Sequence, residues 1–206
     1  MSFARASVTV VDDDVLVLRS LDRLLQSAGF QVEIFSSPHD FLEKRAANPS
    51  GCIVMDLSMP GLSGLELQQA LFGTRDARPV VFISGQGSVP ASVQAMKAGA
   101  IDFLTKPLDE AKLLGAVRVA LDKDRAAREH RADQAAITAC LSSLTPRERE
   151  VLIGVVAGKL NKQIAAELGT AEKTIKVHRA RMMRKMAVDS LAELVRLWTL
   201  TQPAQA

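Results

Sequence analysis

Short apolar runs in the first half of the chain end on polar residues. The polar residues are Asp12 with Asp13, Asp56, Ser84, and Lys106 with Pro107, and they come after apolar runs at residues 8–11, 52–55, 80–83 and 101–104. Segments of helical period separate the runs, which is typical of β-α units around a parallel sheet. The carboxyl ends of parallel strands meet at one edge, where such sheets bind ligands. The pattern therefore predicts a site at that edge.

Residues 7–122 contain five such β-α units. We expect the strands near residues 8–12, 31–35, 52–56, 79–84 and 101–105, in a doubly wound α/β sheet. Gly29 ends the first helix, as a helix-terminating glycine should. Ser88 caps the fourth helix, with Pro90 just inside it.

The composition changes after this region. From Lys123 to Ala136 large apolar residues disappear, and Ala, Arg and Asp dominate. Because these residue types favour a helix over a flexible coil, we expect a semi-rigid connector. The chain is thus predicted to divide into a first domain at 1–122, a mainly helical linker at 123–141 and a second domain at 142–206.

The second domain shows helical patterns alone. Residues 145–148 combine a capping box with a proline at the first helical position, and residues 190–193 form another capping box. A further helix is expected at 171–186. The apolar residues of the last helix are expected in the core, with a dimer contact as the alternative; they are Leu191, Leu194, Val195 and Trp198.

A helix-turn-helix is predicted within this domain. Ala165 supplies a small residue where two helices touch, Gly169 a tight turn, and Ile175 an apolar anchor on the next helix. Ile175 shares its inner face with Met182 and Met186. The opposite face carries Lys173, Lys176, Val177, Ala180 and Arg184. A basic helix after such a turn fits the major groove of DNA, although a basic run alone is more often a solvated helix face.

Composition is consistent with two soluble domains. The 206 residues carry a net charge of +3, which combines about −3 over residues 1–122 with about +6 over the remainder, so only the second part is expected to meet a polyanion. No apolar run approaches the roughly 20 residues that span a membrane, and no signal peptide is recognisable. We therefore expect a cytoplasmic protein that makes no membrane contact. Cys52 and Cys140 are expected to be reduced packing residues.

The acidic residues at the strand ends indicate a particular chemistry. Asp12, Asp13 and Asp56 would repel one another without a cation, and an oxygen-only site suits Mg²⁺. Lys106 is placed to pair with a carboxylate or with a phosphoryl group, and Ser84 supplies a hydroxyl. These are the parts that phosphoryl transfer needs. A chance cluster of acidic loop residues near a surface lysine is the simpler alternative.

The motifs resemble a known family. Residues 11–14, 55–64, 83–85 and 99–107 look like the receiver domain of two-component response regulators. Residues 145–152, 161–165 and 173–179 resemble the LuxR-type output domain. Together the motifs span nearly the whole chain and are most similar to the FixJ/NarL-like subfamily.

The resemblance implies roles for individual residues. Asp56 would accept a phosphoryl group from a sensor histidine kinase, and Lys106 would neutralise the acyl phosphate. Ser84 and Phe103 would be the switch residues that turn toward the modified site. The implied Mg²⁺ ligands are Asp12, Asp13, Asp56 and the backbone carbonyl of Ser58.

The resemblance also implies an output. Phosphorylation would drive homodimerisation through an exposed face around Val89, Val93, Met96 and Phe103. The dimer would bind double-stranded promoter DNA and work with RNA polymerase, and the protein would not be an enzyme beyond its own phosphoryl transfer and dephosphorylation. The expected DNA contacts are Asn161, Lys162, Lys173, Thr174, Lys176, Val177, Arg179, Ala180, Arg181 and Arg184.

Three positions depart from the commonest family pattern. Ser58 and Gln86 replace other residues beside the phosphorylation site, which bears on the lifetime of the phosphorylated state. Ala180 stands where relatives often carry a longer side chain that faces DNA, so the operator sequence does not carry over.

Other functions fit parts of the sequence. An aspartyl-phosphate phosphatase would use Asp56 as its nucleophile, but the second aspartate that such enzymes need two residues later is replaced by Ser58. A LuxR-type regulator that senses a small molecule would need an aromatic pocket, yet the chain has no Tyr and its single Trp lies beyond the linker. A third alternative is DNA binding that does not depend on phosphate.

Overall fold

The computed structural model describes residues 6–45, 50–72, 74, 76–85 and 89–201, with the side chains of Phe72 and Val89 left out. Its contacts divide the chain into two compact units, Met1–Ala127 and Arg128–Ala206.

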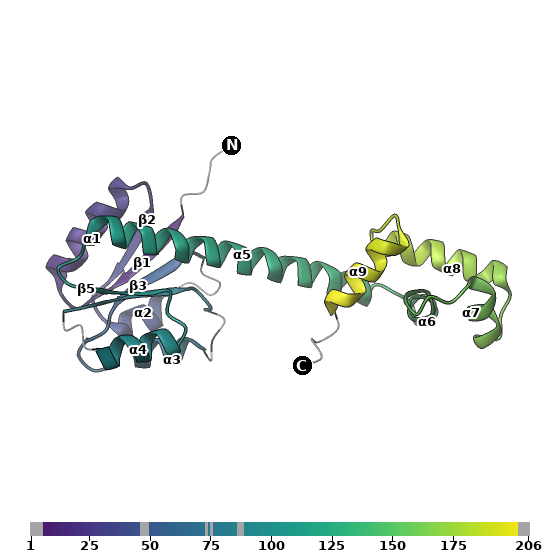
Figure 1. Ribbon diagram of the computed structural model, residues 1–206, viewed down its shortest axis with the longest axis horizontal. Helices are drawn as coiled ribbons and strands as arrows, with labels where there is room; N and C mark the ends of the chain where they lie inside the picture. The colour runs from purple at the N-terminus through teal and green to yellow at the C-terminus, as the bar shows by residue number, and fades with distance from the viewer. Residues whose placement is uncertain (1–5, 46–49, 73, 75, 86–88, 202–206) are drawn as a thin grey trace. The chain divides into compact units, whose positions relative to one another are not determined.

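The first unit is a doubly wound α/β domain (Figure 1). Its strands pair in parallel in the order β2-β1-β3-β4-β5, which confirms the predicted fold class. The elements are β1 (Ser7–Val11), α1 (Val15–Ser27), β2 (Gln31–Phe35), α2 (Pro38–Lys44), β3 (Cys52–Asp56), α3 (Gly64–Phe72), β4 (Val80–Ser84), α4 (Val89–Lys97), β5 (Asp102–Thr105) and α5 (Glu110–Ser142). The expected strands differ from these bounds by at most one residue at either end.

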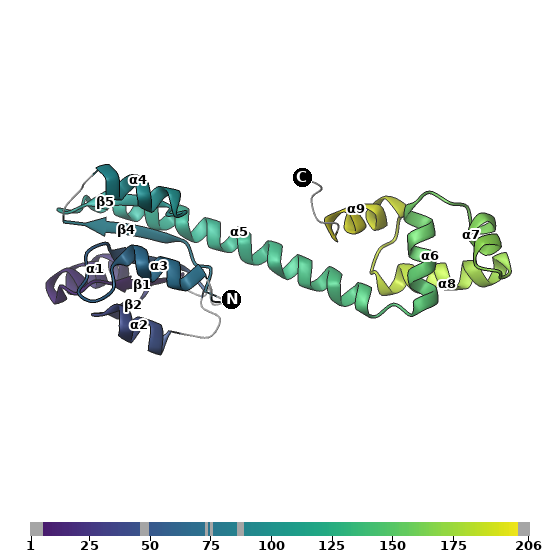
Figure 2. The same cartoon turned by 90° about the horizontal axis from the view of Figure 1, so that it is seen from below.

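Helices cover both faces of the sheet. In Figures 1 and 2, α1 and the first part of α5 lie on one face, and α2, α3 and α4 lie on the other. Successive strand residues point to opposite faces. Val10 and Val54 therefore pack under α1 and α5, whereas Val11 and Met55 pack against α2, α3 and α4. Burial on both faces explains why the strands read as continuous apolar runs.

Local sequence signals set several helix ends. The Asp14 side chain caps α1 by accepting hydrogen bonds from the backbone N–H groups of Leu16 and Val17. Gly29 follows α1 with a φ of +91°, a left-handed conformation that glycine adopts without strain. The predicted cap Ser88 lies outside the described residues.

The helix α5 contains both the expected fifth helix of the first domain and the segment 123–141 that was expected to be a mainly helical linker. It runs without interruption from Glu110 to Ser142, and the division between the two units falls within it. Asp124, which the sequence places in the solvated linker, is only 5% exposed. Its carboxylate accepts a hydrogen bond of 2.9 Å from the backbone N–H of Gly51, just before β3. This contact between distant parts of the chain leaves no local signal in the sequence.

The second unit has helices only among its described residues. They are the end of α5, α6 (Pro146–Val156), α7 (Asn161–Glu167), α8 (Glu172–Lys185) and α9 (Leu191–Thr201). The predicted capping box is present at Thr145, whose hydroxyl and backbone N–H both bond to Glu148. Gly169 has a φ of +62° in the turn between α7 and α8, where the helix-turn-helix pattern requires a glycine.

The core of the second unit differs from expectation at α9. Leu194 is fully buried, but Leu191 and Val195 are 43% and 38% exposed. Trp198 is partly buried against the same core as Leu194. Leu191 lies in the first turn of the helix, and Val195 is turned about 100° away from Leu194 around the helix axis. The expectation that all four residues are core is therefore wrong for Leu191 and Val195.

Across the part of the chain that the structure describes, no helix is both long enough and apolar enough to span a bilayer.

Candidate functional site

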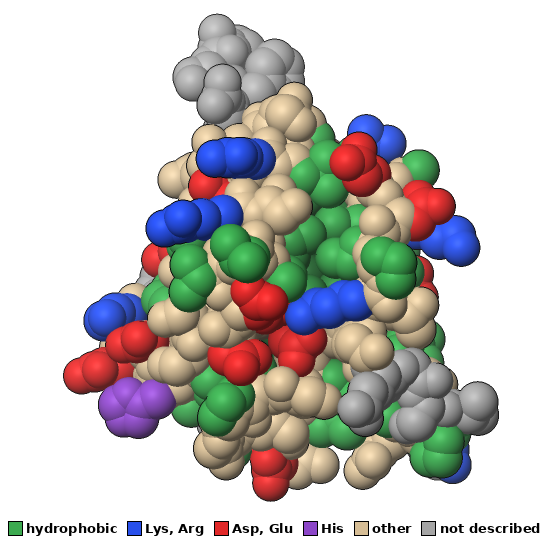
Figure 3. Space-filling view, turned by 90° about the vertical axis from the view of Figure 1, so that its left-hand side faces the viewer, with side chains coloured by type: hydrophobic (Ala, Val, Ile, Leu, Met, Phe, Trp, Pro, Cys, Tyr) green, Lys and Arg blue, Asp and Glu red, His purple; other side chains and the backbone are tan. Residues whose placement is uncertain are grey.

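Two carboxylates meet one ammonium at the carboxyl edge of the sheet. Asp12 directly follows β1 and Asp56 is the last residue of the neighbouring strand β3. The Nζ atom of Lys106 lies 2.7 Å from Asp12 Oδ2 and 2.8 Å from Asp56 Oδ1. Figure 3 shows this end of the molecule, where acidic side chains gather beside a basic one. The structure thus brings together three residues that lie 44 to 94 positions apart.

Backbone N–H groups orient the two carboxylates. The N–H of Asp14 donates to Asp12 Oδ1 at 2.8 Å, and the N–H of Ser58 donates to Asp56 Oδ2 at 2.7 Å. Sequence reasoning assigned Ser58 a role through its carbonyl, and its N–H contact was not foreseen. Every carboxylate oxygen of the pair is therefore in a charged or backbone hydrogen bond, so the side chains are held in one geometry.

Burial and charge act against each other at this site. Burial raises the pKa of Asp12 above its usual value, and this outweighs the lowering by the hydrogen bonds from Lys106 and Asp14. Burial alone would lower the pKa of Lys106, but its hydrogen bonds to Asp12 and Asp56, together with their charges, raise that pKa overall. The ammonium therefore stays protonated, and ionising the buried Asp12 is costly.

The other predicted residues of the first unit lie on the adjoining strands. Ser84 is the last residue of β4 and is fully buried, and its backbone carbonyl accepts from the N–H of Lys106 at 2.8 Å. Phe103 lies in β5 opposite Phe82 of β4 and is partly buried against the cluster that contains Phe82. The hydroxyl and the aromatic ring thus come from neighbouring strands.

The donor atoms suit a hard cation, but the three aspartates are not gathered for one. Carboxylate and carbonyl oxygens are the ligands that Mg²⁺ prefers. Asp13 is exposed beside the buried Asp12, and the Lys106 ammonium lies between Asp12 and Asp56. Among the described residues, no three His, Cys, Asp or Glu side chains surround a common point. In this conformation the ammonium, together with the backbone N–H groups, satisfies the carboxylates.

The predicted dimerisation face is partly open to solvent. Val93 and Met96 of α4 are 46% and 47% exposed, whereas Ala95 of the same helix is fully buried in the core. Phe103 is half-buried. Val89 is the first residue of α4, and its side chain lies outside the described residues.

The helix α8 separates into a buried and a basic face. Ile175 and Met182 are buried, as the pattern predicts. The exposed residues include Lys162 of α7 and a set on α8: Lys173, Thr174, Lys176, Val177, Ala180, Arg181 and Arg184. Arg179 and Asn161 are half-buried, and the Arg179 guanidinium donates to the Asn161 side chain at 3.0 Å, which ties α8 to the start of α7.

One basic residue of α8 has a structural contact that the sequence did not indicate. Lys185 Nζ lies 2.7 Å from Glu148 Oε2 of α6 and 2.9 Å from the carbonyl oxygen of Ser143. The same Glu148 oxygen accepts from the backbone N–H of Thr145. The Lys185 ammonium and these hydrogen bonds lower the pKa of Glu148 to about 2. Lys185 therefore joins α8 to α6 and to the loop before it.

Comparisons with known proteins find matches in both parts of the chain. The family model of the response regulator receiver domain matches residues 8–118, and that of the luxR family of bacterial regulatory proteins matches residues 142–198. The chain is 45% identical to the response regulator protein TodT of Pseudomonas putida, over 94% of this chain and 86% of that protein. It is 41% identical to the transcriptional regulatory protein FixJ of Bradyrhizobium diazoefficiens, over 94% of both chains.

A solved structure is similar as well. The response regulator StyR is 48% identical and superimposes with a TM-score of 0.89, covering 95% of this chain and 99% of that chain.

Proposed function

Because this chain belongs to the two-component response regulators, with a receiver domain followed by a LuxR-type DNA-binding domain, we propose that phosphorylation of Asp56 by a sensor histidine kinase activates it for promoter binding. The observation that carries the proposal is the contact of one Lys106 ammonium with both Asp12 and Asp56. A carboxylate that already lies against a fixed cation is well placed to gain a dianionic group.

The transfer uses Asp56 as the nucleophile. A carboxylate oxygen of Asp56 attacks the phosphorus of the kinase phosphohistidine, the phosphorus–nitrogen bond breaks, and the imidazole leaves with a proton from solvent. Lys106 stays within reach of the new phosphoryl oxygens and offsets their charge. The Ser84 hydroxyl, which belongs to the neighbouring strand β4, would turn to donate to one of those oxygens.

Receiver domains generally bind Mg²⁺ at this acidic pocket. The residues that would hold it here are Asp12, Asp13, Asp56 and the Ser58 carbonyl, and the ion would supply positive charge next to the phosphoryl group. For this to happen the Lys106 ammonium must give up part of its contact with Asp12 and Asp56, because the same oxygens serve both cations.

Phosphorylation then shifts the equilibrium between a resting and an activated conformation of the receiver. Movement of Ser84 and Phe103 toward the modified site would repack the side of the domain formed by β5 and α4. The exposed Val93 and Met96 would be covered by a second copy of the receiver. A dimer presents two α8 helices, which suits two half-sites about one DNA turn apart, with RNA polymerase as a later partner.

The modification itself is tested with acetyl phosphate and Mg²⁺ on the intact chain. We expect intact-mass spectrometry to show one added phosphoryl group on the unaltered protein and none on Asp56→Asn. Asp122→Asn is the matched control, because Asp122 is exposed on α5 and paired with Arg125. A phosphoryl group that persists in the Asp56→Asn protein would contradict the assignment.

The output is tested by two measurements on the phosphorylated protein. Sedimentation should show a monomer-to-dimer shift that Val93→Lys and Met96→Lys prevent while the mass change persists. DNA fragments selected from a random pool should bind more tightly after phosphorylation. Equal affinity with and without the phosphodonor would favour DNA binding that is independent of phosphate.

A further inference from the structure

The first residue of α3 lies directly against the backbone of Asp56. Gly64 is buried, and its N–H donates a hydrogen bond of 2.9 Å to the carbonyl oxygen of Leu57. A methyl group at position 64 would overlap the carbonyl oxygen of Asp56, and it would lie 3.2 Å from Leu57 Cα and 3.0 Å from the Phe82 ring. Glycine is the residue that allows two backbone segments to approach so closely. Position 64 therefore has room for a hydrogen atom and not for a side chain.

Space, and not backbone conformation, excludes a side chain from this position. The φ of Gly64 lies outside the left-handed region, so other residues could adopt its backbone conformation. The surrounding groups are held in place. Asp56 pairs with Ile83 of β4, and the N–H of Leu57 donates to the Ile83 carbonyl at 2.9 Å. Phe82 is fully buried, so its ring has no free space to enter.

The loop that joins β3 to α3 is fixed at both ends. At its start, the N–H of Ser58 donates to Asp56 Oδ2 at 2.7 Å. At its end, the Ser63 N–H and hydroxyl both donate to Glu66 Oε2, at 2.8 and 2.7 Å, and the hydroxyl accepts from the Glu66 N–H at 3.3 Å. This is a capping box, which fixes the first turn of α3. Because Gly64 follows Ser63 directly, the loop and the helix have one position relative to Asp56.

We propose that Gly64 is a positioning residue for phosphorylation at Asp56, an inference that rests on the function proposed above. Because position 64 carries no side chain, α3 begins against the end of β3, and the Asp56 carboxylate is held by the Ser58 N–H and the Lys106 ammonium. A side chain there must either push α3 and the loop away or displace the Asp56 backbone together with its carboxylate. Both movements change the geometry between Asp56 and Ser58.

Gly64→Ala tests this inference in the full-length protein. The rate of phosphorylation by acetyl phosphate and Mg²⁺ is followed by intact-mass spectrometry and divided by the folded fraction obtained from urea unfolding. A displacement of about 1 Å near reacting groups can cost about a hundredfold in rate, so we expect a decrease of about ten- to a hundredfold. The amide proton of Ser58 should also change its NMR chemical shift in the folded variant, because its hydrogen bond to Asp56 is altered. A purely stabilising residue would change neither quantity in the folded molecules.

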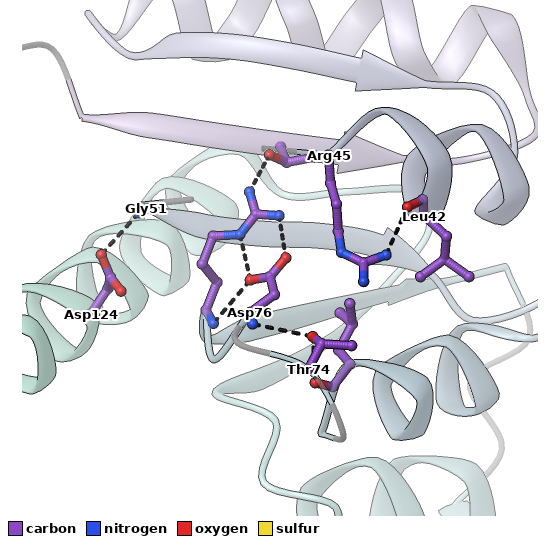
Figure 4. Close-up of polar contacts among 9 residues, drawn as sticks. Leu42, Arg45, Gly51, Thr74, Asp76 and Asp124 are labelled. Carbon is purple, nitrogen blue, oxygen red and sulfur yellow. Dashed lines mark hydrogen bonds and ion pairs between the residues drawn. The ribbon is translucent and has the colours of Figure 1, made fainter. Parts of the chain in front are cut away.

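Two other glycines provide matched controls. Gly51 precedes β3 at the opposite end of the strand, where its N–H donates to Asp124 at 2.9 Å (Figure 4). A methyl group at this position would overlap the backbone of Ser7, and the φ of +104° adds strain. Gly51→Ala should therefore destabilise the receiver, yet leave the normalised rate and the Ser58 shift unchanged. Gly115→Ala on α5 meets no other part of the chain within 4 Å and should leave both readouts unchanged as well.

The inference is overturned if folded Gly64→Ala is phosphorylated at the rate of the unaltered protein, if its Ser58 shift is unchanged, or if Gly51→Ala is slowed as much. If Gly64→Ala does not fold, Glu66→Ala decides, because it removes the bonds that fix Ser63 without adding an overlap. We expect a smaller decrease in rate from that variant, and an unchanged rate would overturn the inference. No phosphorylation of the unaltered protein would instead overturn the proposed function, and this inference with it.

Discussion

Single residues in this protein are placed by the balance between burial and charge. Asp12 has no exposed surface, yet it must be anionic to pair with Lys106. The cost of that burial appears in its raised pKa. Such a carboxylate serves the site but lowers the free energy of unfolding, as is common where function needs a buried charge.

Asp12→Asn should therefore stabilise the receiver at neutral pH, by on the order of 1 kcal/mol. Folding raises the pKa of Asp12 above 3.8, so the folded state favours the protonated carboxyl. The contribution of Asp12 to the free energy of unfolding is therefore most favourable below pH 3.8, and this stabilisation is lost as the pH rises through the folded-state pKa. The gain in Asp12→Asn should shrink toward acid pH. Urea unfolding followed by NMR signals of β1 and β3 measures it, with the exposed Asp122→Asn as the control. A loss of stability at neutral pH would contradict the argument.

Glu148 has the opposite behaviour. Its pKa is lowered from 4.5 to about 2 by Lys185 and by the N–H of Thr145. Its contribution to stability is thus full above 4.5 and is lost as the pH falls toward about 2. Glu148→Gln should lower the urea midpoint of the second unit at neutral pH, and the difference should disappear in acid. Trp198, the single tryptophan, reports this transition by fluorescence, and Glu150→Gln is the control.

At the scale of elements, α8 shows how one helix serves both the core and a ligand. Ile175 and Met182 fix its inner face, and Lys185 at its end is taken up by Glu148. The basic residues nearer its start remain exposed. This separation predicts different roles for base-reading and phosphate-binding side chains.

Lys176→Ala should reduce the preference for the selected DNA site over random DNA, by about 1–3 kcal/mol. Lys162→Ala and Arg184→Ala should instead weaken binding to all sequences and flatten the salt dependence of the affinity by about one unit of slope each. Fluorescence anisotropy across a salt series separates the two effects. Arg196→Ala is the control, because it removes an exposed positive charge from α9. Salt-independent binding by the unaltered protein would refute both expectations.

At the scale of the whole molecule, the chemistry is divided between two units joined through α5. The acidic site lies in the first unit, and the basic helix-turn-helix lies in the second. A ligand that binds only one unit stabilises that unit directly, and it reaches the other only through coupling.

Mg²⁺ should therefore raise the denaturant midpoint for unfolding of the receiver. The midpoint of the second unit, reported by Trp198 fluorescence, should stay unchanged. At a free Mg²⁺ concentration one hundred times the dissociation constant, the free energy of unfolding of the receiver should increase by about 2.7 kcal/mol. Denaturation monitored in parallel by Trp198 fluorescence and by NMR signals of β3 separates the unfolding transitions of the two units. Asp13→Asn should reduce the gain. An equal shift of both transitions would mean that the units unfold as one.

Much of the site was predictable because parallel strands place their carboxyl ends together. The runs before Asp12, Asp56 and Ser84 sufficed to put these residues at one edge, and Lys106 followed from the same rule. The sequence could not indicate that the Lys106 ammonium touches both carboxylates, or that the Ser58 N–H holds Asp56. Those contacts depend on loop conformations that no short-range pattern encodes.

By itself the sequence determined the fold class, the position of the polar residues at the ends of apolar strands, and the helix-turn-helix, because apolar periodicity and turn residues act locally. Only the tertiary structure decided that Asp124 is buried against Gly51, that Lys106 contacts both Asp12 and Asp56, and that Lys185 pairs with Glu148. These features arise where segments distant in the sequence pack together, and burial then sets both the cost of each polar group and its partner.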